Sequence, residues 1–285
     1  MSTSELVWLI TGTSSGFGRQ FVLEALSRGD KVIATARETS LSKLEDLKEK
    51  GAAILALDVQ SSLDDLHKIA AEAVKIYGRI DVLVNNAGYI LVGAVEECTP
   101  EETQHQFQTN VFGGLNVARA LLPYMRERKA GTIVWIGSVG GWSTGPYLGL
   151  YCATKWTVRA ISYALHEEIA PLGLRSICVD FGYFRTNFLG EGQRAPPVSR
   201  IPDYQALAEA SESALQAYNG KQPGDPVKGA AAVVDLVHGT GSAKDKPFPI
   251  GVVLGSDAYK TGIDTSTQNL ARLEEWKDFA LATDF

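Results

Sequence analysis

The sequence predicts an α/β protein built on a doubly wound parallel sheet. Short runs rich in Val, Ile and Leu alternate with helical patterns along most of the 285 residues. These runs lack the apolar–polar alternation of a strand with one solvent-exposed face, so helices are expected on both faces of the sheet. A glycine-rich turn joins the first run to the first helix, as in nucleotide-binding βα units.

Seven runs are predicted to be the strands of this sheet. They are LVWLI at 6–10, KVIATA at 31–36, AAILAL at 52–57, IDVLV at 80–84, TIVWIGS at 132–138, RSICVDF at 175–181 and PIGVVLG at 249–255. No linker and no internal repeat divides the chain. We therefore expect one domain over residues 1–285.

Helical patterns fill the intervals between the predicted strands. The first follows the glycine turn, ends at Gly29 and has an apolar face made of Phe17, Phe21, Val22, Ala25 and Leu26. A short second helix carries Leu41, Leu44 and Leu47, and two more are predicted over 61–77 and 101–128. Another runs from Tyr151 to Ala170 and is ended by Pro171 and Gly173.

Two segments depart from this alternation. Residues 189–224 are polar and rich in Gly and Pro, with a helix predicted at about 203–218. Such an insertion is expected to be a substrate lid, and a surface flap without function is the alternative. Residues 256–285 are predicted to be a C-terminal helical extension that covers the pocket, packs on a neighbouring copy or closes the sheet edge, with apolar residues at Leu270, Leu273, Trp276, Phe279 and Ala280.

Charge and composition disfavour several classes of protein. The net charge is −6 and no stripe of basic residues occurs, which argues against nucleic acid or an anionic membrane as partner. The three cysteines and four histidines are scattered, so neither a disulfide framework nor a metal site is expected. The apolar run at 6–10 is too short for a signal peptide or a membrane span. A cytoplasmic protein is expected.

The glycine-rich turn has two possible readings. Gly12, Gly16 and Gly18 would let the backbone turn tightly and approach a pyrophosphate at the N-terminus of the following helix. Gly12-x-Ser14-x-Gly16 also matches the nucleophile elbow of α/β-hydrolases. An elbow needs several strands before it, and only about ten residues precede Ser14. The dinucleotide-binding interpretation is therefore favoured.

Further motifs follow the turn in a fixed order. They are Asn85-Asn86-Ala87-Gly88, Asn110, Ser138 and Tyr151-x-x-x-Lys155. Together with Thr11-Gly12-x-x-x-Gly16-x-Gly18, they make the chain resemble the short-chain dehydrogenase/reductase family over about residues 5–256. The most similar branch contains carbonyl reductases related to retinol and 17β-hydroxysteroid dehydrogenases. The resemblance implies a Rossmann-type fold and an oxidoreductase.

The resemblance also implies roles for four catalytic residues. Tyr151 would be the general acid in reduction and the base in oxidation. Lys155 lies one helical turn further on, and its charge would lower the pKa of the tyrosine. Ser138, at the end of its strand, would donate to the substrate oxygen. Asn110 would position a water molecule on Lys155.

A nicotinamide dinucleotide is the cofactor that the resemblance implies. The predicted cofactor-binding residues are Gly12, Thr13, Ser14, Ser15, Gly16, Phe17, Gly18, Arg37, Asp58, Val59, Asn86, Ala87, Gly88, Tyr151, Lys155, Gly182 and Thr186. No carboxylate ends the second strand, and Arg37 stands there instead, with Arg19 as a possible assistant. Since a guanidinium can pair with a 2′-phosphate, NADP(H) is predicted in preference to NAD(H). Phe181 replaces the family's proline, which is expected to reshape the wall beside the nicotinamide.

The predicted substrate pocket is aromatic, with candidates Tyr89, Trp142, Tyr147, Tyr183, Phe184 and Phe188. It suits a small apolar or aromatic ketone, aldehyde or alcohol. We expect reduction of the carbonyl, with an alcohol or hydroxysteroid dehydrogenase working oxidatively as one alternative and a non-catalytic NADP-binding regulator as the other. A homodimer or homotetramer is expected through the helices that carry Asn110 and Tyr151.

Overall fold

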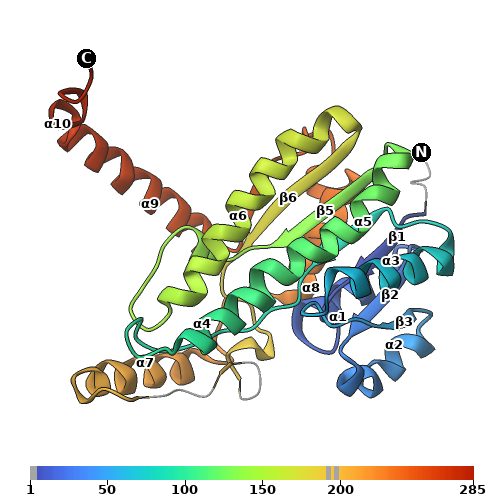
Figure 1. Ribbon diagram of the computed structural model, residues 1–285, viewed down its shortest axis with the longest axis horizontal. Coiled ribbons are helices and arrows are strands. Elements are labelled where there is room, and N and C mark those ends of the chain that lie inside the picture. Colours follow the sequence, from blue (N-terminus) through green and yellow to red (C-terminus); the bar gives the residue numbers. More distant parts are fainter. Residues whose placement is uncertain (1–4, 191–193, 196–198) are drawn as a thin grey trace.

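The computed structural model describes residues 5–190, 194–195 and 199–285. Seven parallel strands form one sheet in the order β3-β2-β1-β4-β5-β6-β7 (Figure 1). They are β1 (Val7–Ile10), β2 (Lys31–Ala36), β3 (Ala53–Ala56), β4 (Val82–Asn85), β5 (Gly131–Ile136), β6 (Leu174–Phe181) and β7 (Gly251–Leu254). All seven predicted strands are present within two residues at each end. The doubly wound, Rossmann-type fold is confirmed.

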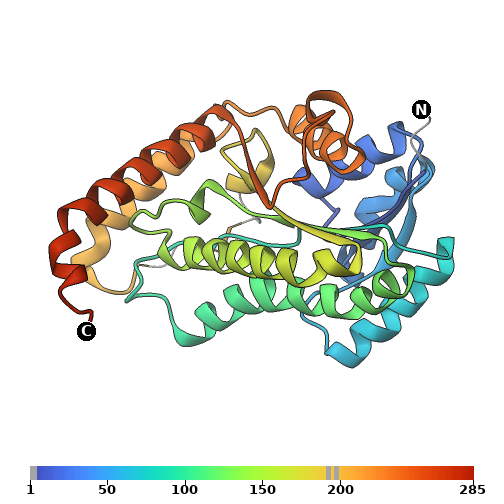
Figure 2. The same cartoon turned by 90° about the horizontal axis from the view of Figure 1, so that it is seen from above.

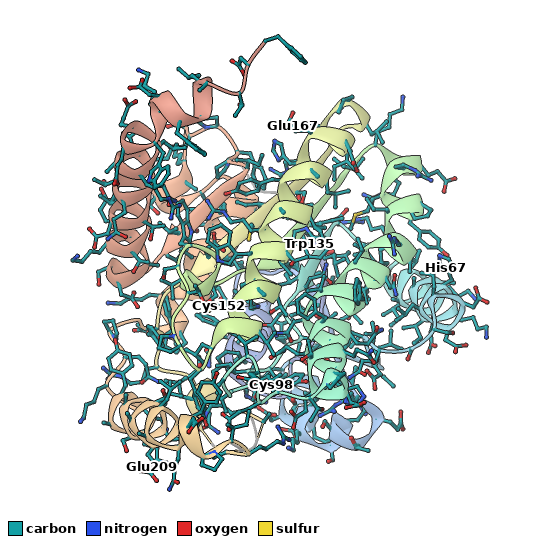
Figure 3. All side chains as sticks on the ribbon, turned by 60° about the vertical axis from the view of Figure 1, so that its left-hand side comes forward. His67, Cys98, Trp135, Cys152, Glu167 and Glu209 are labelled. Atoms are coloured by element: carbon teal, nitrogen blue, oxygen red, sulfur yellow. The ribbon has the colours of Figure 1, made fainter. Side chains whose placement is uncertain are left out.

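Helices cover both faces of this sheet, as the doubly apolar strands require (Figure 2). α1 (Gly16–Ser27) and α8 (Pro226–His238) pack together on one face. α3 (Leu63–Tyr77), α5 (Gly114–Arg128) and α6 (Gly149–Ile169) cover the other face. Each face has its own buried apolar cluster. Trp135, labelled in Figure 3, is buried in the cluster beneath α3, α5 and α6, and its indole nitrogen donates to Ser176 Oγ at 3.1 Å.

The helix predicted over 101–128 is interrupted. α4 (Pro100–Phe107) begins with a capping box between Thr99 and Glu102, and α5 follows only after a π-helical segment at Gln108–Gly113. A Cβ added to Gly113 would lie 2.8 Å from Val59, so the widened turn brings the chain close to the loop after β3. π-helical turns inside helices often mark functional sites, and this one carries Asn110.

Other boundaries differ from the prediction in smaller ways. The second helix is a 3₁₀ segment at Glu38–Leu44 followed by α2 (Glu45–Glu49). Helix α8 was not predicted, although the Asp225 side chain caps it by accepting from the Val227 and Lys228 N–H groups. None of the helices in the described ranges is both long and apolar enough to cross a bilayer.

The insertion at 189–224 contains a 3₁₀ turn at Pro202–Tyr204 and α7 (Gln205–Tyr218), close to the predicted helix. Its residues 191–193 and 196–198 lie outside the described part of the chain. The C-terminal extension is α9 (Ser256–Glu275) followed by α10 (Lys277–Leu281). α9 runs away from the body of the molecule (Figure 1).

Candidate active site

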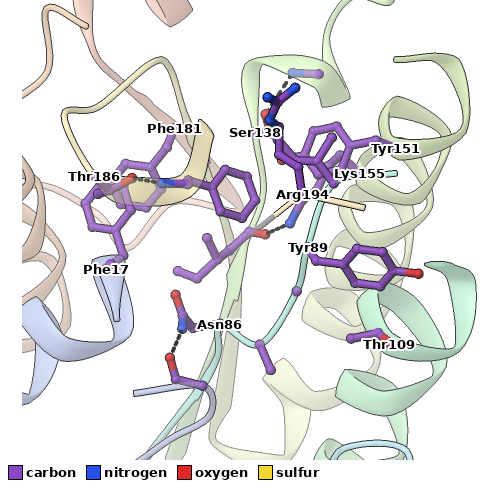
Figure 4. A pocket seen from close by; sticks show the side chains of 18 of the residues that line it. Phe17, Asn86, Tyr89, Thr109, Ser138, Tyr151, Lys155, Phe181, Thr186 and Arg194 are labelled. Carbon is purple, nitrogen blue, oxygen red and sulfur yellow. Dashed lines mark hydrogen bonds between the residues drawn. The ribbon is translucent and has the colours of Figure 1, made fainter. Parts of the chain in front are cut away.

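A cavity of about 740 Å³ opens at the carboxyl ends of the strands, where parallel α/β sheets bind their ligands. It extends from the glycine turn and Arg37 at one end to Tyr151 and Phe188 at the other. Figure 4 shows Phe17, Phe181 and Thr186 on one side of the cavity, with Ser138, Tyr151 and Lys155 on the opposite side.

The glycine turn is shaped to approach a ligand closely. Gly12 and Gly16 have φ angles of +70° and +57°, in the left-handed region that favours glycine. A Cβ on Gly18 would lie only 2.4 Å from the Gly12 carbonyl oxygen. The first turn of α1 contains no acidic residue, and Ser15 at its N-cap makes no side-chain capping bond within the described chain. The amide dipoles of this helix end therefore remain available to an anion, and the turn fits a diphosphate.

Residues 13–16 do not all face the cavity. Ser14, Ser15 and Gly16 line it. The Thr13 side chain is fully buried and donates to the Thr35 carbonyl oxygen at 3.1 Å. The hydroxyl ties the turn to β2, so the Thr13 side chain does not line the cavity in which the cofactor is predicted to bind. Gly18 also lies behind the wall, where it allows close packing.

Asn86 joins the turn to the loop after β4. Its side-chain nitrogen donates to the carbonyl oxygens of Thr11 at 2.8 Å and Gly12 at 3.1 Å. Thr11 Oγ1 in turn accepts from the Asn86 and Ala87 N–H groups at 3.0 Å. Asn86, Ala87 and Gly88 all line the cavity. The two loops thus form one rigid floor.

Arg37 lies at the end of β2 and lines the cavity, as do Asp58 and Val59 beyond β3. Arg37 is exposed to solvent. Arg19 is not part of the cavity wall in the described chain. Its guanidinium pairs with Asp46 and donates to the Lys43 carbonyl oxygen, so Arg19 does not assist Arg37.

Ser138, Tyr151 and Lys155 meet at the far end of the cavity. Lys155 Nζ donates to the Ile136 carbonyl oxygen at 2.8 Å and lies 5.7 Å from the centroid of the Tyr151 ring. Ser138 Oγ accepts from the Gly140 N–H at 3.0 Å, which orients its hydroxyl. These three side chains come from the loop after β5 and from two successive turns of α6.

Burial controls the protonation of this cluster. It raises the pKa of Tyr151 well above that of free tyrosine, and a hydrogen bond with Ser138 opposes this. Burial also lowers the pKa of Lys155 to about 8. In the protein alone, burial therefore raises the pKa of Tyr151, in the opposite direction to the lowering predicted from Lys155.

Asn110 lies behind this cluster and does not line the main cavity. Its amide nitrogen donates to the Tyr89 carbonyl oxygen at 2.9 Å, and its amide oxygen accepts from the Tyr89 N–H at 3.0 Å. A second cavity of about 10 Å³ lies between Asn110, Asn85 and Lys155. That volume matches one water molecule. Both polar atoms of the buried Asn85 amide lack a hydrogen-bond partner among the described residues.

Phe181 forms an aromatic wall in place of the family's proline. Its ring centroid lies 4.1 Å from that of Phe17 and 5.2 Å from that of Phe184. Gly182 and Thr186 follow it along the same wall. The Cβ of Thr186 lies 4.0 Å from the position of a Cβ on Gly16, so this segment faces the glycine turn. Phe181 thus contributes an aromatic ring to this wall, and Thr186 lies on it opposite the glycine turn.

The predicted substrate residues divide into two groups. Tyr89, Tyr183, Phe184 and Phe188 line the cavity. Trp142 and Tyr147 do not, within the described chain, so their assignment as pocket residues is wrong.

Each of the two misassigned residues has a structural partner. The Trp142 indole donates to the buried Asp180 carboxylate at 2.9 Å, and the Arg159 guanidinium stacks 3.6 Å from its ring centroid. Tyr147 has a φ of +71°, and its ring is buried in the cluster that contains Ile90 and Leu189. The two side chains support the loop before α6 from behind.

Several residues that line the main cavity were not named individually from the sequence. They are Ser143, Thr144, Leu148, Cys152, Leu189, Arg194 and Leu215. Those at 143–152 follow β5, and the rule that ligands bind beyond the strand ends could have found them. Leu189, Arg194 and Leu215 come from the insertion predicted to be a substrate lid, although no motif marks them individually. Arg194 is held by Glu212 at 2.8 Å and donates from Nε to the Leu189 carbonyl oxygen at 3.0 Å.

Comparison with known proteins places the chain in a family. Residues 6–196 match the family model for short chain dehydrogenases. Oxidoreductase BOA17 of Botryotinia fuckeliana is 32% identical over 97% of this chain and 98% of its own length. The 3-ketodihydrosphingosine reductase of Bacteroides thetaiotaomicron is 38% identical over 69% of this chain and 70% of its own length.

Solved structures agree with this assignment. A short-chain dehydrogenase from Streptomyces avermitilis is 38% identical and covers 100% of both chains with a TM-score of 0.88. ElxO, solved with NADP bound, is 26% identical over 88% of this chain and 96% of its own, with a TM-score of 0.69. The fold, the family match over two thirds of the chain and the full-length relatives lead to one conclusion: this protein is an oxidoreductase of the short-chain dehydrogenase family.

Proposed function

We propose that the protein reduces an apolar or aromatic ketone or aldehyde to an alcohol with NADP(H). One observation carries the proposal: Ser138, Tyr151 and Lys155 meet at one end of a cavity whose other end holds a diphosphate-shaped turn and an arginine. A dinucleotide lying along this cavity would bring its nicotinamide to the tyrosine. When bound, the nicotinamide supplies the hydride that reaches the carbonyl carbon.

Tyr151 is the proton donor in this mechanism. Its hydroxyl and that of Ser138 would both hydrogen-bond the substrate oxygen, which fixes the carbonyl and offsets the charge that develops on it. Because burial raises the pKa of Tyr151, the phenol is fully protonated before reaction. Lys155 would stabilise the tyrosinate that remains after the proton has moved.

Reprotonation of Tyr151 would use the small cavity behind Lys155. A water molecule there would lie beside Lys155 and between the side chains of Asn85 and Asn110. The Asn85 amide offers one donor and one acceptor that are otherwise unpartnered in the described chain. Buried polar groups normally bond to protein or water. This supports the water-linked relay expected at Asn110.

The NADP(H) preference depends on Arg37. It lies where β2 ends, with Ala36 and Ser40 beside it in the cavity wall and Asp58 beyond the neighbouring strand β3. A guanidinium–phosphate pair contributes roughly 1.5–3 kcal/mol. Arg37→Ala should therefore weaken NADPH binding by about 10- to 100-fold and change NADH binding far less. Arg19→Ala is the matched control, since Arg19 pairs with Asp46. Equal losses for both cofactors would rule out the 2′-phosphate contact.

The substrate class follows from the far end of the cavity. Tyr89, Leu148, Tyr183, Phe188 and Leu215 give it a mostly apolar lining. Such a wall favours an alkyl or aryl group beside the carbonyl. A relative named 3-ketodihydrosphingosine reductase is consistent with a ketone as substrate.

The test is NADPH consumption at pH 7 against aliphatic, aryl and steroidal ketones and aldehydes, with NADH in parallel. Tyr151→Phe should lower turnover by at least about 100-fold while NADPH binding stays within twofold. Tyr163→Phe, on the same helix but outside the cavity wall, is the control. Oxidation of the matching alcohols measures the opposite direction. Tight NADPH binding with no turnover on any substrate would favour the non-catalytic regulator and refute the proposal.

A further inference from the structure

Helix α9 leaves the body of the protein after its first turns. Its N-terminal part packs against β7 and the 3₁₀ turn at Val139–Gly141. From Leu270 to Phe285 every residue is exposed, and the helix projects outward (Figure 1). This arm lies beyond residues 6–196, which match the family model.

An isolated arm of this length is marginally stable. Helices shorter than about 12–15 residues barely form in water without a packing partner. The first turn fixes several backbone dihedral angles and gains only one hydrogen bond. The projecting part nevertheless carries large apolar side chains. Leu270, Leu273, Trp276 and Phe279 are 61%, 69%, 55% and 70% exposed. These side chains favour a partner that covers them.

Leu270 and Leu273 belong to a seam with heptad spacing. Tyr259, Ile263, Ser266, Leu270 and Leu273 follow one another at intervals of four, three, four and three residues. This is the a/d spacing that two packed helices require. Ser266 is the small polar member of the seam. Its hydroxyl donates to the Gly262 carbonyl oxygen at 2.7 Å within the same helix, so it can be buried without losing a hydrogen bond.

We propose that this seam is a dimer interface in which α9 packs antiparallel against α9 of a second copy of this chain. With the two-fold axis near Gln268, Ile263 faces the partner's Leu273, and Ser266 faces the partner's Leu270. The small serine thus lies against a large leucine at both central layers. Each side supplies the same set of residues, as a two-fold interface requires.

The charges beside the seam select the antiparallel direction. Lys260 flanks one end of the seam and Glu274 flanks the other. Antiparallel packing brings Lys260 near the partner's Glu274, twice by symmetry. Parallel packing would place neither residue beside an opposite charge, because their neighbours would be Gly255 and Asn269 of the second copy.

Charge also argues against a lipid surface as the occupant. Residues 256–285 carry six acidic and three basic side chains, so anionic lipid would repel this arm. The direction of α9 away from the body argues against coverage by its own domain (Figure 1). A second copy supplies the same apolar seam and pairs Lys260 with Glu274 at both ends.

Cysteine cross-linking tests the register. Chains bearing Ser266→Cys and chains bearing Leu270→Cys, with different affinity tags, are mixed and oxidised. The antiparallel pair places these positions opposite each other, within reach of a disulfide. Two copies of one variant are offset by four residues, about 6 Å along the axis. The expected product is a mixed-tag dimer from the mixture and none from either variant alone. The protein without either substitution, which retains Cys98, Cys152 and Cys178, is the background control.

Sedimentation tests the interface itself. Leu270→Glu with Leu273→Glu should halve the mass of the assembly at micromolar concentration. Leu172→Glu, an equally drastic change at an exposed leucine elsewhere, should leave the mass unchanged. If the double variant and the unsubstituted protein have the same mass in sedimentation, the proposal is wrong. A halved mass without the mixed-tag disulfide, or a disulfide from Ser266→Cys alone, overturns the antiparallel register. Capture of the intact protein on neutral lipid vesicles, lost in the double variant, would assign the arm to lipid instead.

Discussion

The charged side chain of Lys155 should lower the stability of the folded protein at neutral pH. Replacing Lys155 should therefore raise the free energy of unfolding and abolish turnover. Lys155 is only 7% exposed, and within the described chain its ammonium forms no ion pair with an acidic side chain. Its burial lowers its pKa from 10.5 to about 8. Lys155→Met keeps the length and apolar stem of the side chain and removes the charge.

The magnitude follows from the shift in pKa. A difference of about 2.5 pH units corresponds to about 3 kcal/mol of unfavourable free energy while the amine is charged. Loss of the hydrogen bond to the Ile136 carbonyl oxygen offsets about 1 kcal/mol of the gain. Lys155→Met should therefore raise the free energy of unfolding by about 2 kcal/mol at pH 7.

The pH dependence has a definite sign. Below pH 8 the lysine is charged in both the folded and the unfolded chain, so its full penalty is present. Between about pH 8 and 10.5 the unfolded chain binds more protons than the folded one. The native-sequence protein should then gain about 1.4 kcal/mol per pH unit relative to Lys155→Met. The advantage of the variant should disappear, and reverse, near pH 10.

Urea denaturation at pH 7, 8.5 and 10 measures this difference, because titrating groups distant from Lys155 contribute equally in the two proteins. Lys75→Met, at an exposed site on α3, is the control and should show no such trend. A stability difference that stays flat from pH 7 to 10 would refute the reasoning. NADPH turnover by Lys155→Met should fall by at least about 100-fold.

Three further changes have expected outcomes. Gly18→Ala places a methyl group 2.4 Å from the Gly12 carbonyl oxygen; calorimetric titration should show at least tenfold weaker NADPH binding, and unchanged affinity would contradict the close packing of the turn. Phe181→Ala removes a ring that is 4% exposed and should lower the free energy of unfolding by about 3–5 kcal/mol in urea; a loss below 1 kcal/mol would show that the aromatic wall is not packed. Two arginines hold the pKa of Asp81 below its usual value against the effect of burial, so Asp81→Asn should destabilise the protein at pH 7, and this difference should shrink as pH falls below 4; a pH-independent difference would contradict the ion pairs.

The local signals in the sequence were sufficient to locate the strands and the Ser138, Tyr151 and Lys155 motif. Strands buried on both faces leave continuous apolar runs, and all seven runs became strands in one sheet. The glycines at 12, 16 and 18 could be interpreted because their requirement is local: a tight turn and the start of a helix. The placement of Ser138 and Tyr151 beside one cavity followed from the same rule of strand ends.

Contacts between distant segments were decided only by the tertiary structure. Trp142 and Tyr147 read as pocket aromatics, yet one is held behind the loop by Asp180 and the other is buried beside Ile90. An aromatic residue suits a pocket and a core equally well, and only its packed neighbours distinguish them. The π-helical segment around Asn110 has the same origin, since the close approach of Gly113 to Val59 joins residues far apart in the chain. Sequence alone thus determined the fold and the chemistry that the motifs imply, whereas long-range packing determined which side chains face the cavity.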